Sequence, residues 1–199
     1  MMSPERHMNM KEKVILALIF LGFSLYLPAA QLRVDELMGA LANNTHGAAT
    51  FTEMKYLSIL DEPVESSGEL LFVPPDRLEK HTLKPRIEAL VLKGEVLTVE
   101  GPLQNHGLSL KDYPEVGGMI EGIRATLAGD RKALERVYRL DLEGGSDRWS
   151  LVLTPLDTRL VRLIDRIRME GTGGELRKVE IWQADGDHSV MSIRKGTGS

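Results

Sequence analysis

The sequence contains no cysteine. This absence excludes disulfide bonds, thiol nucleophiles, iron–sulfur clusters and the zinc sites that are built on cysteine. It also excludes a lipid attached to a cysteine side chain, so the protein is not itself a lipoprotein.

Aromatic residues and net positive charge are scarce as well. Only 5% of the residues are aromatic, and the formal net charge is −4. Residues 1–30 carry three basic and two acidic side chains, a net of +1, so the remainder carries −5. A negative chain repels the phosphate backbone of nucleic acids, and few aromatic rings are available for base stacking. We therefore expect no nucleic-acid partner.

The length of 199 residues suits one packed domain, or one domain with a removable segment. Residues 1–30 have the pattern of a secretory signal peptide, because three basic residues precede an uncharged run from Val14 to Ala30 that contains Pro28 near its end. The alternative is a membrane-retained signal anchor, for which an apolar core of about 14 residues is short. We expect cleavage near Ala29 or Ala30, a mature domain of residues 31–195 in the periplasm, and a disordered tail at 196–199.

Two segments have the apolar spacing of amphipathic helices. Between Gln31 and Asn44 apolar residues recur at i, i+3, i+4 and i+7, and Gly47 ends the segment. Asp112 to Leu127 has similar spacing, with Asp112 as the expected N-cap. Three glycines weaken this second helix, each by about 1 kcal/mol relative to alanine. They indicate either a mobile element or a glycine-lined packing face, and the pattern leaves both open.

Elsewhere the apolar period is two, which indicates a meander of short strands rather than alternating βαβ units. A short helical or irregular crossing is expected at Pro155–Ile164, before two closing hairpins that turn at residues 171–174 and 185–187. The strands are expected at Phe51–Ile59, Gly68–Val73, Leu78–Leu83, Arg86–Lys93, Glu95–Glu100, Leu134–Leu142, Trp149–Thr154 (after a Gly144-Gly145 turn), Arg166–Glu170, Leu176–Ala184 and His188–Arg194.

No arrangement of residues nominates a catalytic or metal site. The five histidines are scattered without an i, i+4 pair, and Asp185-Gly186-Asp187 reads as a hairpin turn because the rest of a calcium loop is missing. The phosphate-binding loop and the Gly-x-Ser-x-Gly nucleophile elbow are absent from the sequence. We therefore expect no enzyme activity, no metal and no cofactor.

Each predicted strand has one strongly apolar face, and only two good helices are available to cover these faces. A strongly curved sheet could wrap the helices around an apolar cavity. A fully packed α+β core fits the same alternation, and the residues leave both open. The faces are defined by Trp149, Leu151 and Leu153, by Leu70 and Phe72, by Leu90 and Leu92, and by Val179 and Ile181.

Several short segments have the order and spacing of a known family. They are Phe51-Thr52-Glu53, residues 67–78 (SGELLFVPPDRL), Leu127-Ala128-Gly129-Asp130, residues 149–155 (WSLVLTP), and Lys178-Val179-Glu180-Ile181 followed by Asp185-Gly186-Asp187-His188-Ser189. Together they resemble the LolA-like outer-membrane lipoprotein carrier family over nearly the whole mature chain. The second and third segments are most similar to the LolA-related branch encoded beside acyltransferase and aryl-polyene-type lipid genes.

The resemblance implies a mainly β fold of the α+β kind, an incomplete antiparallel barrel with helices as a lid over an apolar cavity. It implies a monomeric carrier that binds a lipid, lipid-linked product or lipoprotein, taking it from an inner-membrane donor to an outer-membrane acceptor. The residues expected to line the cavity are Phe51, Leu70, Phe72, Leu90, Leu92, Trp149, Leu151, Leu153, Val179 and Ile181, with Met119, Ile120 and Ile123 on the lid.

One position departs from the family pattern. The lipoprotein carriers place a lid-latching arginine at the position that Pro74 occupies here, and Arg77 lies nearby but out of register. The resemblance therefore favours a lipid or a lipid-linked pigment over a lipoprotein as the cargo. The alternatives are an envelope sensor that binds lipid without shuttling it, and a cofactor-free enzyme in a pocket of the same kind.

Overall fold

The computed structural model describes residues 32–43, 47–101 and 105–196. The predicted signal peptide, residues 1–30, and residues 197–199 of the predicted tail lie outside these ranges. Within the described ranges, no helix has both the length and the apolarity needed to span a bilayer.

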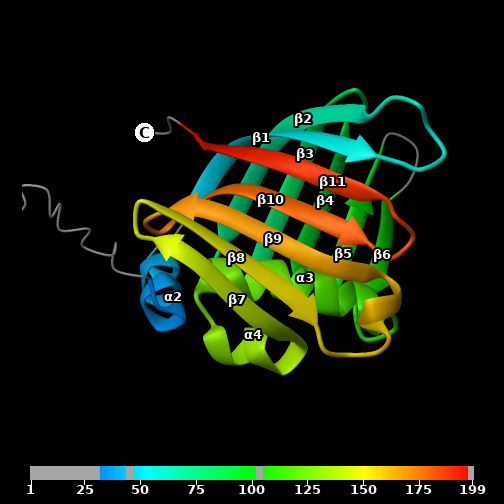
Figure 1. Ribbon diagram of the computed structural model, residues 1–199. Coiled ribbons are helices and arrows are strands. Elements are labelled where there is room, and N and C mark those ends of the chain that lie inside the picture. Colours follow the sequence, from blue (N-terminus) through cyan, green and yellow to red (C-terminus); the bar gives the residue numbers. More distant parts are fainter. Residues whose placement is uncertain (1–31, 44–46, 102–104, 197–199) are drawn as a thin grey trace, which may run out of the picture. The chain divides into compact units, whose positions relative to one another are not determined.

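Eleven strands of the described chain form one antiparallel sheet in the order β6-β5-β4-β3-β2-β1-β11-β10-β9-β8-β7 (Figure 1). The sheet is not closed, because β6 and β7 are its two edges. The predicted mainly β fold with an incomplete antiparallel barrel is confirmed. The strands are β1 (Gly47–Tyr56), β2 (Val64–Val73), β3 (Arg77–Lys84), β4 (Glu88–Lys93), β5 (Val96–Glu100), β6 (Asn105–Ser109), β7 (Tyr138–Gly145), β8 (Arg148–Pro155), β9 (Ile164–Thr172), β10 (Glu175–Gln183) and β11 (His188–Lys195).

One pairing in this sheet joins strands that are distant in the chain. The first strand, β1, pairs with the last strand, β11, from Ala49 opposite Lys195 to Tyr56 opposite His188. All other neighbours are consecutive along the chain. The β1–β11 pairing therefore joins two runs of consecutive strands, β1–β6 and β7–β11, into one sheet.

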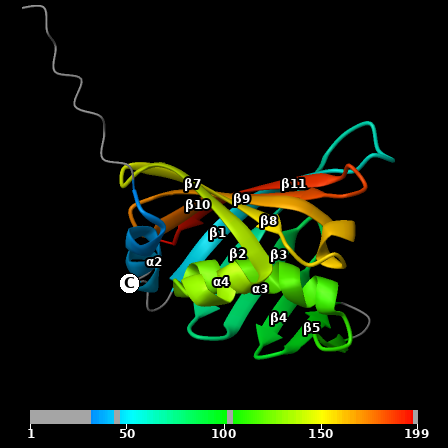
Figure 2. The same cartoon turned by 60° about the horizontal axis from the view of Figure 1, so that its bottom comes forward.

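The helices α2 (Val34–Ala42), α3 (Pro114–Ala128) and α4 (Arg131–Val137) lie against one face of the sheet (Figure 2). A short 3-10 turn, η1 (Leu160–Arg162), comes before β9. The apolar stripe of α2 is buried, as its spacing predicts. The side chains that α2 buries are Leu37, Met38 and Leu41.

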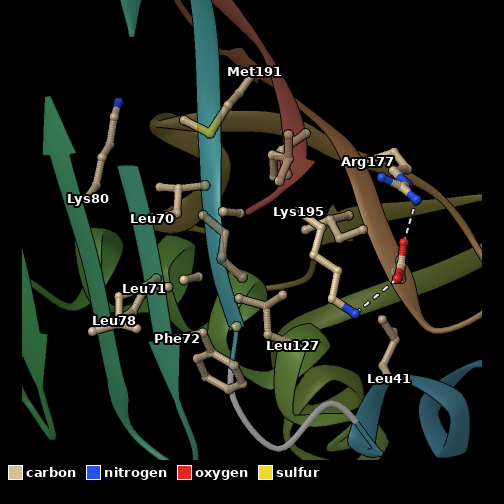
Figure 3. A pocket seen from close by; sticks show the side chains of 18 of the residues that line it. Leu41, Leu70, Leu71, Phe72, Leu78, Lys80, Leu127, Arg177, Met191 and Lys195 are labelled. Atoms are coloured by element: carbon tan, nitrogen blue, oxygen red, sulfur yellow. Dashed lines mark hydrogen bonds and ion pairs between the residues drawn. The ribbon is translucent and has the colours of Figure 1, made fainter. Parts of the chain in front are cut away.

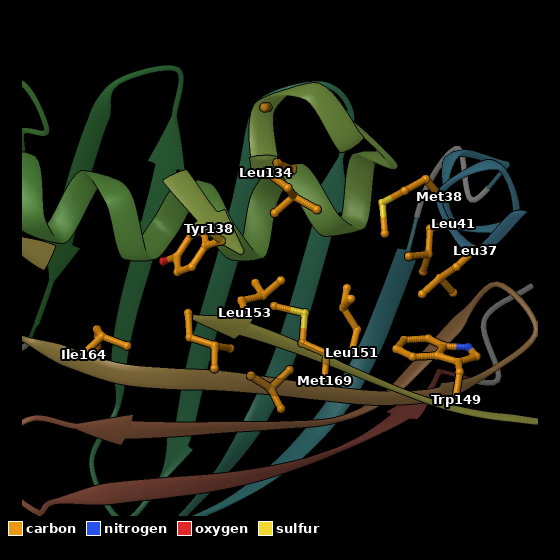
Figure 4. Close-up of a cluster of buried hydrophobic side chains, with 14 of the residues drawn as sticks. Leu37, Met38, Leu41, Leu134, Tyr138, Trp149, Leu151, Leu153, Ile164 and Met169 are labelled. Atoms are coloured by element: carbon orange, nitrogen blue, oxygen red, sulfur yellow. The ribbon is translucent and has the colours of Figure 1, made fainter. Parts of the chain in front are cut away.

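The main hydrophobic core lies between these helices and strands β7–β10 (Figure 4). Trp149, Leu151 and Leu153 of β8 point into it and are almost completely buried. The indole N–H of Trp149 donates a hydrogen bond to the carbonyl of Gly173 at 2.8 Å, so its polar atom is satisfied. This part of the sheet is therefore closed over by packed side chains.

One predicted strand proved to be half helix. The segment Leu134–Leu142 was expected to be extended, but α4 continues to Val137 and only then does β7 begin. The side chain of Asp130 accepts the backbone N–H of Ala133 at 2.9 Å, which caps the helix start. An ion pair between Arg131 and Glu135, one turn apart, adds to this cap. The capping residue and the ion pair thus favour a helix up to Val137, although the apolar alternation of the same segment favours a strand.

The start of α3 also differs from the prediction. Asp112 is not the N-cap; that position belongs to Tyr113, and Pro114 takes the first helical position, where its missing N–H costs nothing. Strand β6 was not predicted, because its sequence is polar and contains Gly107. It is an edge strand that pairs with β5.

Two glycine positions were also misassigned. Gly47 was expected to end the first helix but begins β1, which ends at Tyr56 rather than Ile59. Gly144 was expected in a turn but pairs with Trp149 at the end of β7. Its φ is +95°, and a Cβ atom there would lie 2.3 Å from the carbonyl oxygen of Arg148. The strand end therefore needs a glycine, and the turn itself falls at residues 146–147.

Candidate ligand pocket

Strand register places the predicted cavity residues on one face of the sheet. Residues that pair across antiparallel strands share a face, as do residues two apart along a strand. One row of pairs joins Leu92, Leu78, Phe72 and Gly47, and a second joins Glu53, Met191, Val179, Met169 and Leu151. Because Gly47 and Glu53 are an even number of residues apart on β1, both rows lie on the same face of the sheet. Leu151 and Met169 of the second row belong to the core beneath the helices, so this is the face that the helices cover.

A pocket of about 240 Å³ lies on this face (Figure 3). Its walls come from β1, β2 and β3 on one side of the β1–β11 pairing, and from β10 and β11 on the other. Helices α2 and α3 contribute Leu41, Ile123 and Leu127. The remaining lining residues are Gly47, Ala48, Ala49, Glu53, Leu70, Leu71, Phe72, Leu78, Lys80, Gly174, Glu175, Leu176, Arg177, Val179, Ile181, Ser189, Met191, Ile193 and Lys195.

Only some of the predicted cavity and lid residues line this pocket. Leu70, Phe72, Val179, Ile181 and the lid residue Ile123 do so. The three β8 residues, Trp149, Leu151 and Leu153, instead belong to the packed core. Phe51, Leu90, Leu92, Met119 and Ile120 are buried or half-buried outside the lining of the pocket. Ligand binding by any of these residues stays a prediction.

Several lining residues were missed by the sequence reasoning. Met191 and Ile193 alternate along β11 as the predicted residues do on their strands, so the same signal could have found them. Glu53 and Lys80 could not be found in that way, because charged residues on a strand ordinarily indicate a solvated face. Their inward position is visible only in the register of the folded sheet.

Glu53 and Lys80 form an ion pair at one end of the pocket. The exposed fraction of the Glu53 side chain is 6% and that of Lys80 is 19%. The Lys80 ammonium donates to Glu53 Oε2, which also accepts from the Ser66 hydroxyl at 3.4 Å. The Lys80 nitrogen also lies 4.9 Å from the centroid of the Phe51 ring, which is a cation–π contact. The pair therefore brings both a positive and a negative group to an otherwise apolar wall.

A second charged group lies at the other end of the pocket. Glu175 forms ion pairs with Lys195, at 3.2 Å, and with Arg177, as the dashed lines in Figure 3 show. The hydrogen bond from Lys195, with the nearby charge of Arg177, lowers the pKa of the Glu175 carboxyl. Lys195 and Arg177 are well exposed. Because two cations share one carboxylate, this end carries an excess positive charge.

The glycines of α3 form a packing face, one of the two roles that their spacing left open. A Cβ atom at Gly122 would lie 2.8 Å from the Tyr138 ring, and one at Gly118 would lie 3.0 Å from Leu160. The Tyr138 hydroxyl donates to the Gly118 carbonyl at 2.9 Å, and burial raises the pKa of that hydroxyl. The glycines thus let α3 approach the β7 side of the sheet closely.

On its other side, α3 is tied to the β4–β5 turn. The guanidinium of Arg124 donates to the carbonyl of Gly94 at 3.2 Å and pairs with Glu121 one turn earlier on the helix. Ile123 and Leu127 of the same helix face the pocket. Helix α3 therefore spans the concave side of the sheet from β7 to the β4–β5 turn and covers part of the pocket.

Residues 27–194 match the family described as "Outer membrane lipoprotein carrier protein LolA-like". The chain belongs to this family. No curated protein sequence matches the LolA-like chain.

Solved structures resemble this LolA-like chain at low identity. A LolA superfamily protein from Nitrosomonas europaea is 13% identical, with 82% of this chain and 92% of that chain covered and a TM-score of 0.42. LprF from Mycobacterium bovis is 12% identical, with 83% and 94% covered and a TM-score of 0.37. A chain of the Pseudomonas aeruginosa MucA/MucB complex is 14% identical, with 83% and 58% covered and a TM-score of 0.45.

The Pro74 position of this LolA-like chain lies at the turn between β2 and β3. Proline offers neither an N–H nor a side-chain donor. Arg77 pairs with Glu79 and alternates with Leu78 and Lys80, which places it on the opposite face from the pocket. Arg77 therefore does not point toward α3.

Proposed function

We propose that the protein is a periplasmic carrier that shelters the acyl chain of a lipid or lipid-linked product in this pocket and moves it from the inner to the outer membrane. The observation that carries the proposal is the mostly apolar pocket between the sheet and α3, lined by residues such as Leu70, Phe72 and Val179. Membership of the LolA-like family supports the same role.

The free energy of hydrocarbon transfer sets what such a pocket must supply. Each buried CH₂ group is worth about 0.8 kcal/mol, so a chain of twelve carbons requires roughly 10 kcal/mol of shelter from water. Ligand pockets commonly measure about 300–1,000 Å³. At about 240 Å³ this pocket is smaller, so a long acyl chain needs additional space. We expect the pocket to widen by displacement of α3, whose pocket-facing residues are Ile123 and Leu127.

The proposal includes no catalytic step. In the described residues, no group of three or more histidine, aspartate and glutamate side chains is placed to hold a metal ion. The carboxylates of the pocket, Glu53 and Glu175, are engaged in ion pairs. Sheltering a hydrocarbon chain needs no bond to be made or broken, so binding and release are the whole activity that we propose.

The proline at position 74 is the reason that we propose a lipid rather than a lipoprotein as the cargo. Without an arginine at that position, α3 is held by apolar packing, by the Arg124–Gly94 hydrogen bond and by the Tyr138–Gly118 hydrogen bond. We expect such a cover to open without an energy-coupled donor, so that the isolated protein takes up simple lipids spontaneously. We also expect it not to replace a general lipoprotein carrier in a strain depleted of that protein. Full rescue of the strain would show that lipoprotein is the cargo.

The binding proposal can be tested with the purified mature domain. A neutral naphthylamine dye should enter the pocket and be displaced by the methyl ester of a twelve-carbon fatty acid. Leu70→Glu should abolish dye binding, because it adds a carboxylate to the apolar wall of the pocket. The variant should still fold, because Lys80 lies directly opposite position 70 and places a positive charge near the new carboxylate. Leu83→Glu is the matched control, because Leu83 is exposed and lies outside the pocket lining. Equal dye binding by both variants would contradict the proposal.

Shuttling needs a separate test. Native mass spectrometry of protein isolated from its own periplasm should show a bound lipid, which acceptor vesicles then remove. A protein that keeps its lipid and is isolated in a stable complex with an envelope protein would instead indicate a sensor.

A further inference from the structure

We infer that the Glu53–Lys80 pair is a selectivity element that recognises a neutral hydrogen-bonding group, a hydroxyl or an amide, carried by the acyl cargo. This inference rests on the proposed binding function and names the class of cargo more closely. The pair lies on the pocket wall beside apolar residues such as Leu70, apart from the charged group around Glu175.

Stability alone gives no reason for an ion pair at this position. Desolvation of two charges offsets most of their attraction, and apolar replacements of a buried pair are often neutral or stabilising. A pocket meant for plain hydrocarbon would therefore do as well with leucine and methionine at positions 53 and 80. The pair is useful if the ligand brings a polar group that must itself be satisfied on leaving water.

The pair has hydrogen-bonding capacity left on both partners. Lys80 has three N–H donors; among the described residues its hydrogen-bond partner is Glu53, and the Phe51 ring takes up a further side of the ammonium. The hydrogen bonds and ion pairs of Glu53 use Oε2, which leaves Oε1 without a hydrogen-bond donor in the described part of the chain. One donor and one acceptor are thus presented side by side.

A second cation, the Nζ of Lys55, lies 4.0 Å from Glu53 Oε2, but Lys55 is 49% exposed and outside the pocket lining. Within the lining, Glu53 and Lys80 therefore balance each other and favour a neutral ligand group. An ionised carboxylate at Lys80 would approach the Glu53 carboxylate, and an ammonium at Glu53 would approach Lys80. A hydroxyl or a carboxamide can instead accept from Lys80 and donate to Glu53 with no net charge introduced. Either group provides this chemistry, whether it is a substituent on the chain or the link to a headgroup.

The position of the pair fixes which part of the cargo it would meet. Along β1, Glu53 is six residues from Gly47, which corresponds to roughly 20 Å of extended strand. The excess positive charge of Lys195 and Arg177 lies toward the Gly47 end, because Lys195 pairs with Ala49. Ile193, which pairs with Phe51, lies between these two polar elements along β1 and β11 and keeps the wall between them apolar.

The test compares ligands that differ in one group, in the wild type and in the double variant Glu53→Leu, Lys80→Met. Four twelve-carbon ligands displace the neutral dye: the methyl ester, the primary amide, the alcohol and the ionised acid. For each protein, the Kd of the amide and of the alcohol is divided by the Kd of the methyl ester. The hydration of the free ligands cancels when these ratios are compared between proteins.

We expect both ratios to rise about tenfold in the double variant, while the methyl ester binds as well as before or better. The matched control is Glu180→Leu, Lys178→Met, which removes an ion pair with a similarly buried glutamate that lies outside the pocket lining; its ratios should equal those of the wild type. A larger effect on the alcohol would identify a hydroxyl as the natural group, and a larger effect on the amide would identify an amide link.

Unchanged ratios in the double variant would overturn the inference, as would a selective loss of the ionised acid, which would make the cargo an anion. A purely structural pair would alter the binding of all four ligands equally. If none of the ligands displaces the dye from the wild type, the proposed binding function fails instead.

Discussion

Strands β7–β10, the packed half of the sheet, and strands β1–β6, the open half, have the same alternation of apolar residues. The apolar face is covered by helices in the packed half and borders the pocket in the open half. On β8, Leu151 and Leu153 are 0% exposed, because α2, α3, α4 and the neighbouring strands enclose them. On β2, Leu70 is half-buried and faces the pocket. The periodicity of a strand predicts which face is apolar; it does not predict whether a helix or a ligand covers that face.

The largest effect is expected from a charge placed in the packed half. Leu151→Glu buries a carboxylate among Trp149, Met169 and other apolar side chains, which costs several kcal/mol out of a typical total of about 5–15. We expect this variant to be largely unfolded, whereas Leu70→Glu unfolds at nearly the wild-type denaturant concentration but loses dye binding. Urea unfolding measured by far-UV circular dichroism compares them. Equal stability losses would mean that the two halves are packed alike.

A smaller loss is expected where α3 approaches the packed half. Gly122→Ala brings a methyl group against the Tyr138 ring and should destabilise the protein by about 1–3 kcal/mol. Gly39→Ala on α2 is the control, because open space surrounds that position and the substitution should stabilise by about 0.5–1 kcal/mol. Both values follow from urea unfolding. A neutral Gly122→Ala would show that α3 is held loosely against Tyr138.

A contact on the opposite side of α3 can be removed at a smaller cost in stability. Arg124→Met removes the hydrogen bond to the Gly94 carbonyl and should cost about 0.5–1.5 kcal/mol. Because this contact holds α3 over the open half, we expect stopped-flow mixing to show faster uptake of the dye. Arg136→Met, an exposed arginine on α4, should leave the uptake rate unchanged. Slower uptake by Arg124→Met would mean that the contact does not restrain the cover.

The smallest effect concerns the outer face of the open half. The hydrogen bond with His81, with a further contribution from Arg77, lowers the pKa of Glu79 below its ordinary value of 4.5. A carboxyl group whose pKa is lower in the folded state stabilises the fold at pH values above its ordinary pKa. This contribution is lost as the pH falls through the folded-state pKa. Glu79→Gln should therefore be slightly less stable than the wild type at pH 7, with a difference that shrinks below about pH 4.5. A difference that stays constant down to pH 3 would contradict this assignment.

The strand pattern and the family could be predicted from the sequence, because alternation and short motifs are local signals. The helix α4 was missed although Asp130 is a good N-cap, because its few apolar residues also fit a strand. The sequence could not predict that Leu151 is buried in the core while Leu70 lines the pocket, because this depends on where the helices pack against the sheet. Glu53 and Lys80 are 27 residues apart, and only the register of three strands brings them together.

The β1–β11 pairing also has a consequence for the order in which the protein can fold. Every other strand pair joins consecutive strands and can form early, whereas residues 49–56 must wait for residues 188–195. Contacts between such distant segments form slowly, because the chain must close a long loop before they are gained. During synthesis from the N-terminus, β1 keeps one unpaired edge until the last strand appears. Since the walls of the pocket come from both sides of this pairing, a chain that lacks only its final strand cannot complete the pocket.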